Sequence, residues 1–597
     1  MAITRRTTLG WLTAGAASAP LLSACATAPV VPSGSDSAFG QIAAQWLDES
    51  LRLSPVAATG LGDHRFDHLV DDVSTAGRAA QVNLARSVLT RLDALPSEGL
   101  SRADQVDAAL LRQNLRAQIW SDAELQSWAW DPLTYAATAG GALYSLQARE
   151  FAPLPDRLRS ATARMRALPA LLAESRRQLQ PARVPEIHAT TAVGQNRGLH
   201  SLVDGFTAEA NALQGAEREA LLSAAAQLKA AVDEHQRWLE TELVPNARGN
   251  WRIGARLYDQ KLAYALNSDL TRQEIVRRGE RALADTRAQM YVLATRILAG
   301  RPGAPETPAN PNADQQQHAI EAALELAYAE KPGRNAIVST AEAMLEQTTA
   351  FVREKDLVTV PNDPIRIGLV PEFQRGVALA YCDAPGPLDR GQATYYKIAP
   401  LPEDWTDAQV DSFLREYNLR SMQELTIHEA MPGHYLQLAH SNRYPSVIRA
   451  VLGSGTFTEG WACYAQDVMA EAGYLGGEDL YQLVHLKWVL RMIANAMLDP
   501  AVHAGDMTRD QAIDLMVRGT FQQEREAAGK WTRAQLSSAQ LPTYFVGWEE
   551  HWEARRAAER AWGSGFNLKR YHDGLLSFGS PPVRYARALL LDEAIPA

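Results

Sequence analysis

Apolar side chains recur at helical spacing from about residue 38 to the end of the chain. Long segments rich in Ala, Leu, Arg and Glu show no sustained two-residue alternation of the kind that half-buried strands need. Residues 271–274 (TRQE) and 406–409 (TDAQ) match the capping box that precedes a helix. Strands are expected only within 357–403, which is rich in Val, Ile, Tyr and Pro. The sequence predicts a mainly α, multi-helical body with at most a small β element.

One compositional break interrupts this helical pattern. Residues 301–316 read RPGAPETPANPNADQQ, and the prolines and asparagines in this stretch cannot sustain a helix. The break could separate two domains or join two lobes of one body. Because both sides have the same composition, we expect a surface loop within one helical domain, 38–597, with lobes of about 38–300 and 317–597.

The N-terminus has the features of an export signal. Arg5 and Arg6 precede an apolar stretch that is too short to span a bilayer permanently, and the pair resembles a twin-arginine signal. Residues 22–25 (LSAC) resemble a bacterial lipobox, which predicts cleavage after residue 24 and a lipid on Cys25. Residues 25–37 are predicted to form a flexible tether. We therefore expect an exported protein anchored by lipid to the bacterial cell envelope, facing the periplasm or in the outer membrane; an unmodified signal is the alternative.

Charge and cysteine content limit the partners. The chain has 59 Lys and Arg against 69 Asp and Glu, a net charge of -10, so no general basic surface exists to bind nucleic acid. Apart from Cys25, only Cys382 and Cys463 remain, too few for a disulfide framework, and the two could be bridged or free. No later apolar stretch is long enough to span a membrane, so membrane contact is expected only through the lipid. The sequence leaves the oligomeric state open.

The most informative segment is 428–434, HEAMPGH. Zinc hydrolases commonly place two histidines four residues apart on a helix, with a glutamate beside the first as general base. Here His428 and His434 are six residues apart, which would put them on nearly opposite sides of an ideal helix. Pro432 removes a helical N–H, and Gly433 permits unusual backbone angles, so we expect a break that brings both imidazoles together. The alternative is a kinked core helix with two structural histidines.

A carboxylate downstream completes a possible ligand set. Glu459 is expected in the first turn of a second helix that begins near residue 453. A structural role at the helix N-terminus is the simpler interpretation, but a buried carboxylate is costly without a partner. We therefore predict that His428, His434 and Glu459 bind Zn²⁺ and leave a position for water, with Glu429 as the base. Cys463, one turn further, is a less favoured ligand.

These motifs resemble a known family. The segments 428–437 (HEAMPGHYLQ) and 459–465 (EGWACYA) are similar to the signatures HEAxPGHxxQ and EGWAxYAE of the bacterial family called domain of unknown function 885. Residues 54–62 and 571–579 also resemble segments of that family. The family is in turn similar to zinc peptidases of the angiotensin-converting-enzyme, oligopeptidase and carboxypeptidase Taq groups. The resemblance implies a two-lobed helical body with a deep groove and a peptide substrate.

The same resemblance suggests further site residues. Tyr544 is the first candidate to donate a hydrogen bond to the reacting oxyanion, His572 is the second, and Arg555 could anchor a substrate carboxylate. Before Tyr544 the chain reads Leu-Pro-Thr, where the family pattern is Pro-Gly-Gln-Ala-x-Ser-Tyr. A zinc-dependent peptidase is therefore the expected function. A metal-dependent hydrolase of a non-peptide amide or ester, or a non-catalytic lipoprotein that binds zinc or peptide, are the alternatives.

Overall fold

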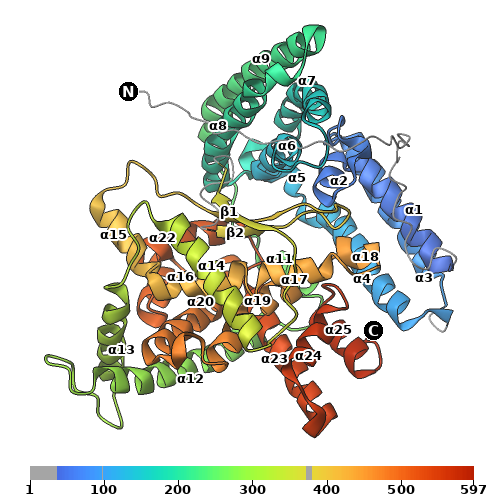
Figure 1. Ribbon diagram of the computed structural model, residues 1–597. Helices are drawn as coiled ribbons and strands as arrows, with labels where there is room; N and C mark the ends of the chain where they lie inside the picture. Colours follow the sequence, from blue (N-terminus) through green and yellow to red (C-terminus); the bar gives the residue numbers. More distant parts are fainter. Residues whose placement is uncertain (1–36, 97–98, 372–379, 597) are drawn as a thin grey trace, which may run out of the picture. The chain divides into compact units, whose positions relative to one another are not determined.

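Helices build most of the structure, a computed structural model that describes residues 37–96, 99–371 and 380–596 (Figure 1). The predicted mainly α fold is confirmed. The predicted signal (1–24), Cys25 and nearly all of the tether lie outside the described residues. All described residues belong to one compact unit. Among the described residues, no helix combines the length and the apolar character needed to cross a membrane.

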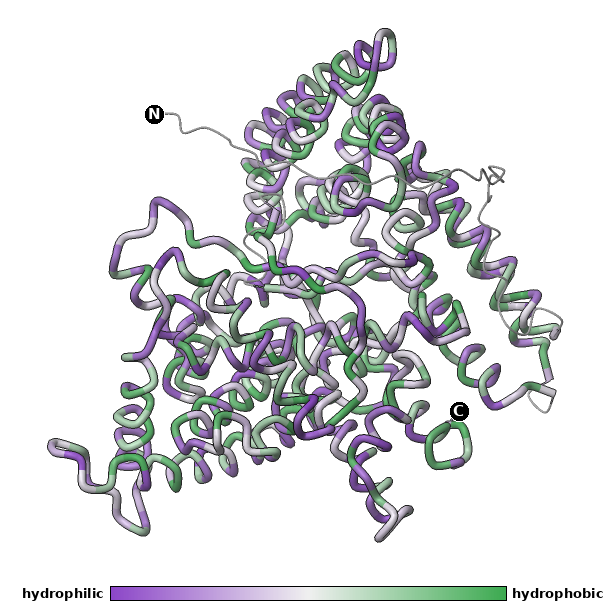
Figure 2. Tube along the Cα trace, in the orientation of Figure 1, coloured by the Kyte–Doolittle hydropathy of each residue, from purple (hydrophilic) through white to green (hydrophobic). Residues whose placement is uncertain are grey.

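The helices before residue 250 pack together around apolar cores. In this region the helices are α1 Ala38–Leu53, α2 Pro55–Leu61, α3 Thr75–Asp93, α4 Arg102–Trp120, α5 Ser127–Trp130, α6 Pro132–Gln147, α7 Leu154–Gln178, α8 Glu186–Ala208, α9 Gly215–Trp238 and α10 Val244–Asn246. Leu143, Leu158, Val203 and Leu228 belong to one core, which α6 to α9 enclose. Figure 1 shows α7, α8 and α9 lying side by side, and in Figure 2 these helices alternate hydrophilic and hydrophobic residues, as one-sided burial requires.

A second core crosses the compositional break. The helices α11 Ala255–Leu266, α12 Arg272–Leu298 and α13 Ala313–Tyr328 pack around it, whereas α14 Ile337–Glu354 packs on the C-terminal core described below. Residues 299–312 form a loop between α12 and α13, whereas residues 313–316, which were expected to belong to the break, begin α13. Met290 of α12 shares a core with Ile320 of α13 and Ile493 of α20. The division into lobes of about 38–300 and 317–597 stays a prediction. Thr271 caps α12 as predicted, although Glu274 pairs with Arg277 and Arg278 instead of closing a capping box.

The strands lie within the predicted segment. β1 Ile365–Leu369, β2 Ala380–Asp383 and β3 Thr394–Ile398 form a sheet in the order β1-β3-β2, with β1 parallel and β2 antiparallel to β3. Tyr396 at the centre pairs with Ile367 on one side and Cys382 on the other. Tyr396 is fully buried, so one face of this small sheet covers part of the core.

The C-terminal helices hold the remaining core. They are α15 Asp407–Glu416, α16 Leu419–Glu429, α17 His434–Ser441, α18 Val447–Val451, α19 Gly455–Glu471, α20 Asp479–His503, α21 Arg509–Asp514, α22 Glu524–Leu536, α23 Pro542–Trp562, α24 Leu568–Leu576 and α25 Val583–Leu591. The capping box predicted at Thr406 and Gln409 begins α15. Ile427, Phe457 and Trp461 are buried in a core shared by α16, α19 and α24, which positions the segments described next.

Candidate metal centre

The helix that carries His428 breaks directly after it. α16 ends at Glu429 and α17 begins at His434, with Pro432 and Gly433 in the break. The Pro432 carbonyl accepts a hydrogen bond from the indole of Trp461 (2.9 Å), which ties the break to α19. Gly433 has a φ of -77° and a ψ of -128°, which lies outside the helical and extended regions. A Cβ at this position would lie 2.0 Å from the His428 carbonyl oxygen, so the close approach requires glycine.

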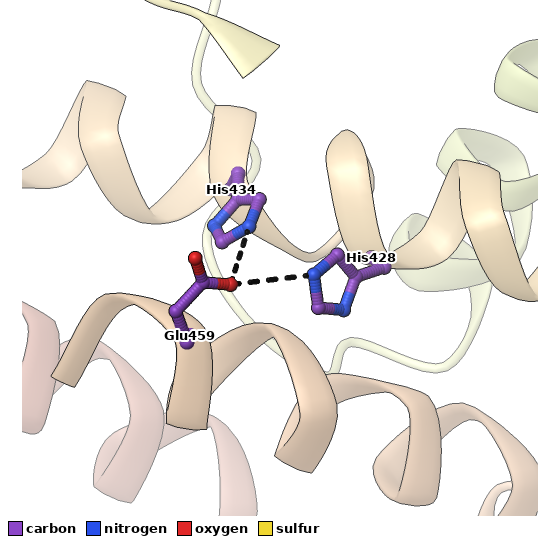
Figure 3. Close-up of side chains that lie close together, drawn as sticks. All are labelled: His428, His434 and Glu459. Carbon is purple, nitrogen blue, oxygen red and sulfur yellow. Dashed lines mark ion pairs between the residues drawn. The ribbon is translucent and has the colours of Figure 1, made fainter. Parts of the chain in front are cut away.

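The break turns both imidazoles toward one carboxylate (Figure 3). Nε2 of His428 lies 3.6 Å and Nε2 of His434 lies 3.4 Å from Oε2 of Glu459. One possible ligand atom from each residue lies within 4.8 Å of the other two. The structure therefore brings together the three residues that the sequence predicted as a ligand set.

The distances from Oε2 of Glu459 to the two imidazole nitrogens fit binding of a shared metal ion better than direct hydrogen bonds. Hydrogen bonds between nitrogen and oxygen are about 2.7–3.2 Å long. In a tetrahedral site with bonds of about 2.0–2.2 Å, neighbouring ligand atoms lie about 3.3–3.6 Å apart. Oε2 of Glu459 is buried and has no hydrogen-bond partner among the described residues. A buried oxygen without a partner, at this distance from two imidazole nitrogens, fits zinc coordination.

The electrostatics of the cluster also favour a bound cation. Burial would raise the pKa of Glu459, but the neighbouring imidazoles of His428 and His434 hold it far below its ordinary value. Burial would lower the pKa of His434, but Glu459 raises it. Glu459 is therefore an anion that attracts positive charge. It is the fifth residue of α19 and lies beyond the first turn, so the sequence expectation for its position is wrong and the helix dipole does not explain it.

The cluster lines a cavity of about 340 Å³ together with Glu429 and Tyr544. The ring of Tyr544 stacks on that of His428, with centroids 6.1 Å apart. Its hydroxyl accepts a hydrogen bond from Arg533 (3.3 Å). Burial, together with the charge of Glu459, raises the pKa of Tyr544 to about 12. Tyr544 therefore keeps its proton near neutral pH and can donate it in a hydrogen bond into the cavity.

Sequence reasoning missed Gln540, which donates a hydrogen bond to Oε1 of Glu459 (3.3 Å). The sequence does contain a signal for Gln540, because the family pattern has a glutamine four residues before the tyrosine and Gln540 precedes Tyr544 by four residues. The pattern has glycine one residue earlier. Here Ala539 occupies that place with a φ of 63°, a conformation that favours glycine. The family motif thus aligns without a gap and supports the placing of Tyr544.

His572 and Arg555 do not reach the cavity, which corrects the roles suggested for them. Both ring nitrogens of His572 are occupied, one by the Leu357 carbonyl (2.7 Å) and the other by the Tyr464 hydroxyl (2.9 Å). Arg555 pairs with Glu471 (2.7 Å) and Glu559 (3.0 Å). Neither side chain lines the cavity, and the His572 ring packs against Trp461 of α19. Cys382 and Cys463 do line it and are free, and burial keeps the pKa of both thiols high.

A buried polar network supports the helices behind the cluster. His485 of α20 lies between Glu424 of α16 (3.2 Å) and Asp467 of α19 (3.0 Å). Asp467 also accepts hydrogen bonds from Trp548 and Trp552 of α23 (2.6 Å each). The two carboxylates raise the pKa of His485 to about 10 against the effect of burial. This charged bridge joins the helices that carry His428, Glu459 and Tyr544.

Two glycines let α19 and α23 approach closely. A Cβ on Gly460 would lie 2.3 Å from the carbonyl carbon of Gly547, and a Cβ on Gly547 would lie 2.0 Å from the Thr456 carbonyl oxygen. Backbone atoms cannot move aside as a flexible side chain can. This contact places Glu459, the neighbour of Gly460, beside Tyr544, three residues before Gly547.

Replacing Gly547 by alanine is expected to lower the free energy of unfolding by about 1–3 kcal/mol or more, because the added methyl group overpacks the helix contact. Chemical denaturation measures the change. The control is Gly529→Ala in α22, where a Cβ meets nothing within 4 Å. That exposed substitution is expected to raise stability by about 0.5–1 kcal/mol. Equal effects of the two substitutions would contradict the close packing of α19 on α23.

The fold and the cluster together define a class: mainly α proteins with a cavity lined by two histidines and a glutamate in position to share one ion. The chain belongs to the DUF885 family, described as bacterial proteins of unknown function, whose profile matches residues 55–590. The predicted family is therefore confirmed. The similarity to zinc metallopeptidases stays a prediction.

Two solved structures resemble this chain along nearly its full length. A candidate lipoprotein of unknown function from Shewanella oneidensis is 32% identical, with a TM-score of 0.77 over 93% of this chain and 100% of its own. A candidate lipoprotein from Colwellia psychrerythraea is 17% identical, with a TM-score of 0.75 over 93% of this chain and 99% of its own, and supports the fold alone. No curated protein matches the sequence.

Proposed function

We propose that this protein is a zinc-dependent hydrolase that cleaves peptides. The observation that carries the proposal is the approach of two imidazole nitrogens to one unpartnered glutamate oxygen, at 3.6 and 3.4 Å, in the wall of a cavity. Three protein ligands leave one position for water, which is the arrangement of catalytic zinc sites. Glu429, directly after the ligand His428, lines the same cavity as a carboxylate base should.

Each side chain has a defined task in this mechanism. His428, His434 and Glu459 would hold the zinc ion, which supplies Lewis acidity and lowers the pKa of water toward about 7. Glu429 accepts a proton from the attacking water and returns it to the leaving amine. Tyr544 donates a hydrogen bond to the carbonyl oxygen as that oxygen gains negative charge. Gln540 orients Glu459 through its second oxygen.

Metal analysis and a peptide library test the proposal. The purified protein is expected to contain about one zinc per chain and to cleave a subset of peptides in the library. A chelator should abolish cleavage and added zinc should restore it, because three ligands bind a metal that exchanges more readily than a closed four-ligand site. Zinc binding without cleavage of peptides, amides or esters would instead favour a binding protein. Cleavage of amides or esters alone would favour the non-peptide hydrolase.

We also propose that the protein works at the bacterial envelope, held by a lipid on Cys25. The lipobox at 22–25 supports this location, and so does the description of both solved relatives as candidate lipoproteins. Peptides in that compartment are then the accessible substrates. Mass spectrometry of the membrane fraction identifies the lipid, and Cys25→Ser should release the protein from that fraction.

A further inference from the structure

Two basic side chains in the cavity wall have no carboxylate partner in the part of the chain that the structure describes. Lys530 and Arg533, one turn apart on α22, line the cavity. Among the described residues, neither has a carboxylate oxygen within 4.0 Å. Lys530 is 5% exposed, and its ammonium donates a hydrogen bond to the side-chain oxygen of Asn495 (2.9 Å). Buried cations are usually paired, so an unpaired lysine and arginine in a cavity indicate an anionic ligand.

The carboxylates nearby cannot serve as those partners, because other cations already bind them. Glu526 pairs with Arg491 (2.5 Å), which also lines the cavity, and accepts a hydrogen bond from Tyr417 (3.0 Å). Glu416 pairs with Lys487 (2.8 Å). Burial and the charges of Arg491 and Arg533 lower the pKa of Lys530 well below its ordinary value, despite Glu526. A carboxylate entering the cavity would supply the missing negative charge.

The two cations lie close to the candidate zinc ligands. Arg533 donates a hydrogen bond to the Tyr544 hydroxyl (3.3 Å), and the Tyr544 ring stacks on His428. A single tyrosine side chain therefore connects the cationic end of the cavity to the ligand cluster. A carboxylate held by Lys530 and Arg533 would belong to a residue at or next to the bond being cleaved, since an extended residue spans only about 3.3–3.6 Å.

We propose that Lys530 and Arg533 bind the free C-terminal carboxylate of the substrate, so that the enzyme removes residues from the carboxyl end of peptides. This inference rests on the proposed hydrolytic function and narrows its substrate class. Arg491, held by Glu526, lines the same end of the cavity and adds positive charge there. Lys530 and Arg533 therefore take the role of carboxylate anchor, which the family resemblance suggested for Arg555.

The first experiment compares one cleaved peptide with its C-terminal amide. The free acid is expected to be cleaved with a kcat/KM about 10- to 100-fold higher, since charge-assisted hydrogen bonds to the carboxylate are lost in the amide. Mass spectrometry should find products that have lost one or two C-terminal residues. Equal rates for the acid and the amide, or cleavage far from the C-terminus, would overturn the assignment while leaving the hydrolytic function intact.

The second experiment replaces Lys530 by methionine, an unbranched side chain of similar shape that lacks the ammonium group. The variant is expected to lose most of the preference for the acid over the amide. The matched control is Lys261→Met: Lys261 is half-buried and donates to a neutral oxygen, that of Ser538 (2.8 Å), but it does not line the cavity. The control should retain the preference. A variant at 530 that keeps the full preference would overturn the assignment.

A binding measurement separates this inference from the proposed function. Calorimetry compares 3-phenylpropionate with 3-phenylpropionamide, which contain no cleavable peptide bond. The carboxylate is expected to bind the wild type at least about tenfold more tightly, and Lys530→Met should remove the difference. This result would support the carboxylate site even if no peptide were cleaved. If Lys530→Met fails to fold, equal affinities of the wild type for the two compounds would still overturn the assignment.

Discussion

Replacing Glu429 by glutamine is expected to reduce peptide hydrolysis by about 10²- to 10⁴-fold, the usual contribution of a general base. Glutamine has nearly the same shape but cannot accept a proton from water. Glu429 is not a member of the ligand cluster, so the variant should bind zinc as the wild type does. The measurements are kcat/KM for a cleaved peptide and the zinc content of the same preparation.

The two readouts together distinguish the role of Glu429 from a structural one. A loss of zinc along with activity would mean that Glu429 supports the ligand cluster and is not the base. Unchanged turnover would refute the assignment directly. Thermal unfolding of the variant should match that of the wild type, because Glu429 has no ion-pair partner in the described part of the chain whose loss would destabilise the fold.

Replacing His434 by alanine should remove one of three zinc ligands and abolish both metal binding and turnover. Loss of an outer partner of a ligand typically costs about 10- to 100-fold in metal affinity, so loss of a ligand itself should cost more. The purified variant is expected to contain little zinc and to recover no activity when zinc is added. Metal analysis and peptide hydrolysis measure the two effects.

His440 provides the control for this substitution. It lies in the same helix, α17, and its side chain contacts the Thr359 carbonyl (2.8 Å), away from the cavity. His440→Ala should retain zinc and activity. If His434→Ala keeps its zinc while His440→Ala loses it, the ligand set built around the break after His428 is wrong.

The helix break and the two histidines beside it could be predicted from sequence because the residues that determine them, 428–434, are consecutive. A proline and a glycine between His428 and His434 make a continuous helix unfavourable, and the structure ends α16 at Glu429 and begins α17 at His434. The reason for Gly433 was only partly predicted. Its missing side chain matters as well, since a Cβ would meet the His428 carbonyl oxygen, and this contact could not be predicted from sequence.

The assignment of more distant residues depended on helix packing. Tyr544, His572 and Arg555 all lie in helices near the C-terminus, and the sequence does not distinguish which helix face meets the cavity. The contact between Gly460 and Gly547 turns Tyr544 toward Glu459, while Tyr464 and the Leu357 carbonyl hold His572 elsewhere. Lys530 and Arg533 had no recognisable motif, because an amphipathic helix with a cationic side looks the same whether that side faces solvent or a cavity.

By itself, the sequence determined the helical class, the short strands between 357 and 403, the helix break and the residue types that could hold a metal. These follow from interactions between residues close along the chain, which periodicity, caps and helix breakers report. Only the tertiary structure decided that Lys530 and Arg533 line the cavity and that His572 and Arg555 do not. Such contacts depend on the relative rotation of packed helices, and a rotation of a third of a turn exchanges a buried face for an exposed one without changing any local pattern.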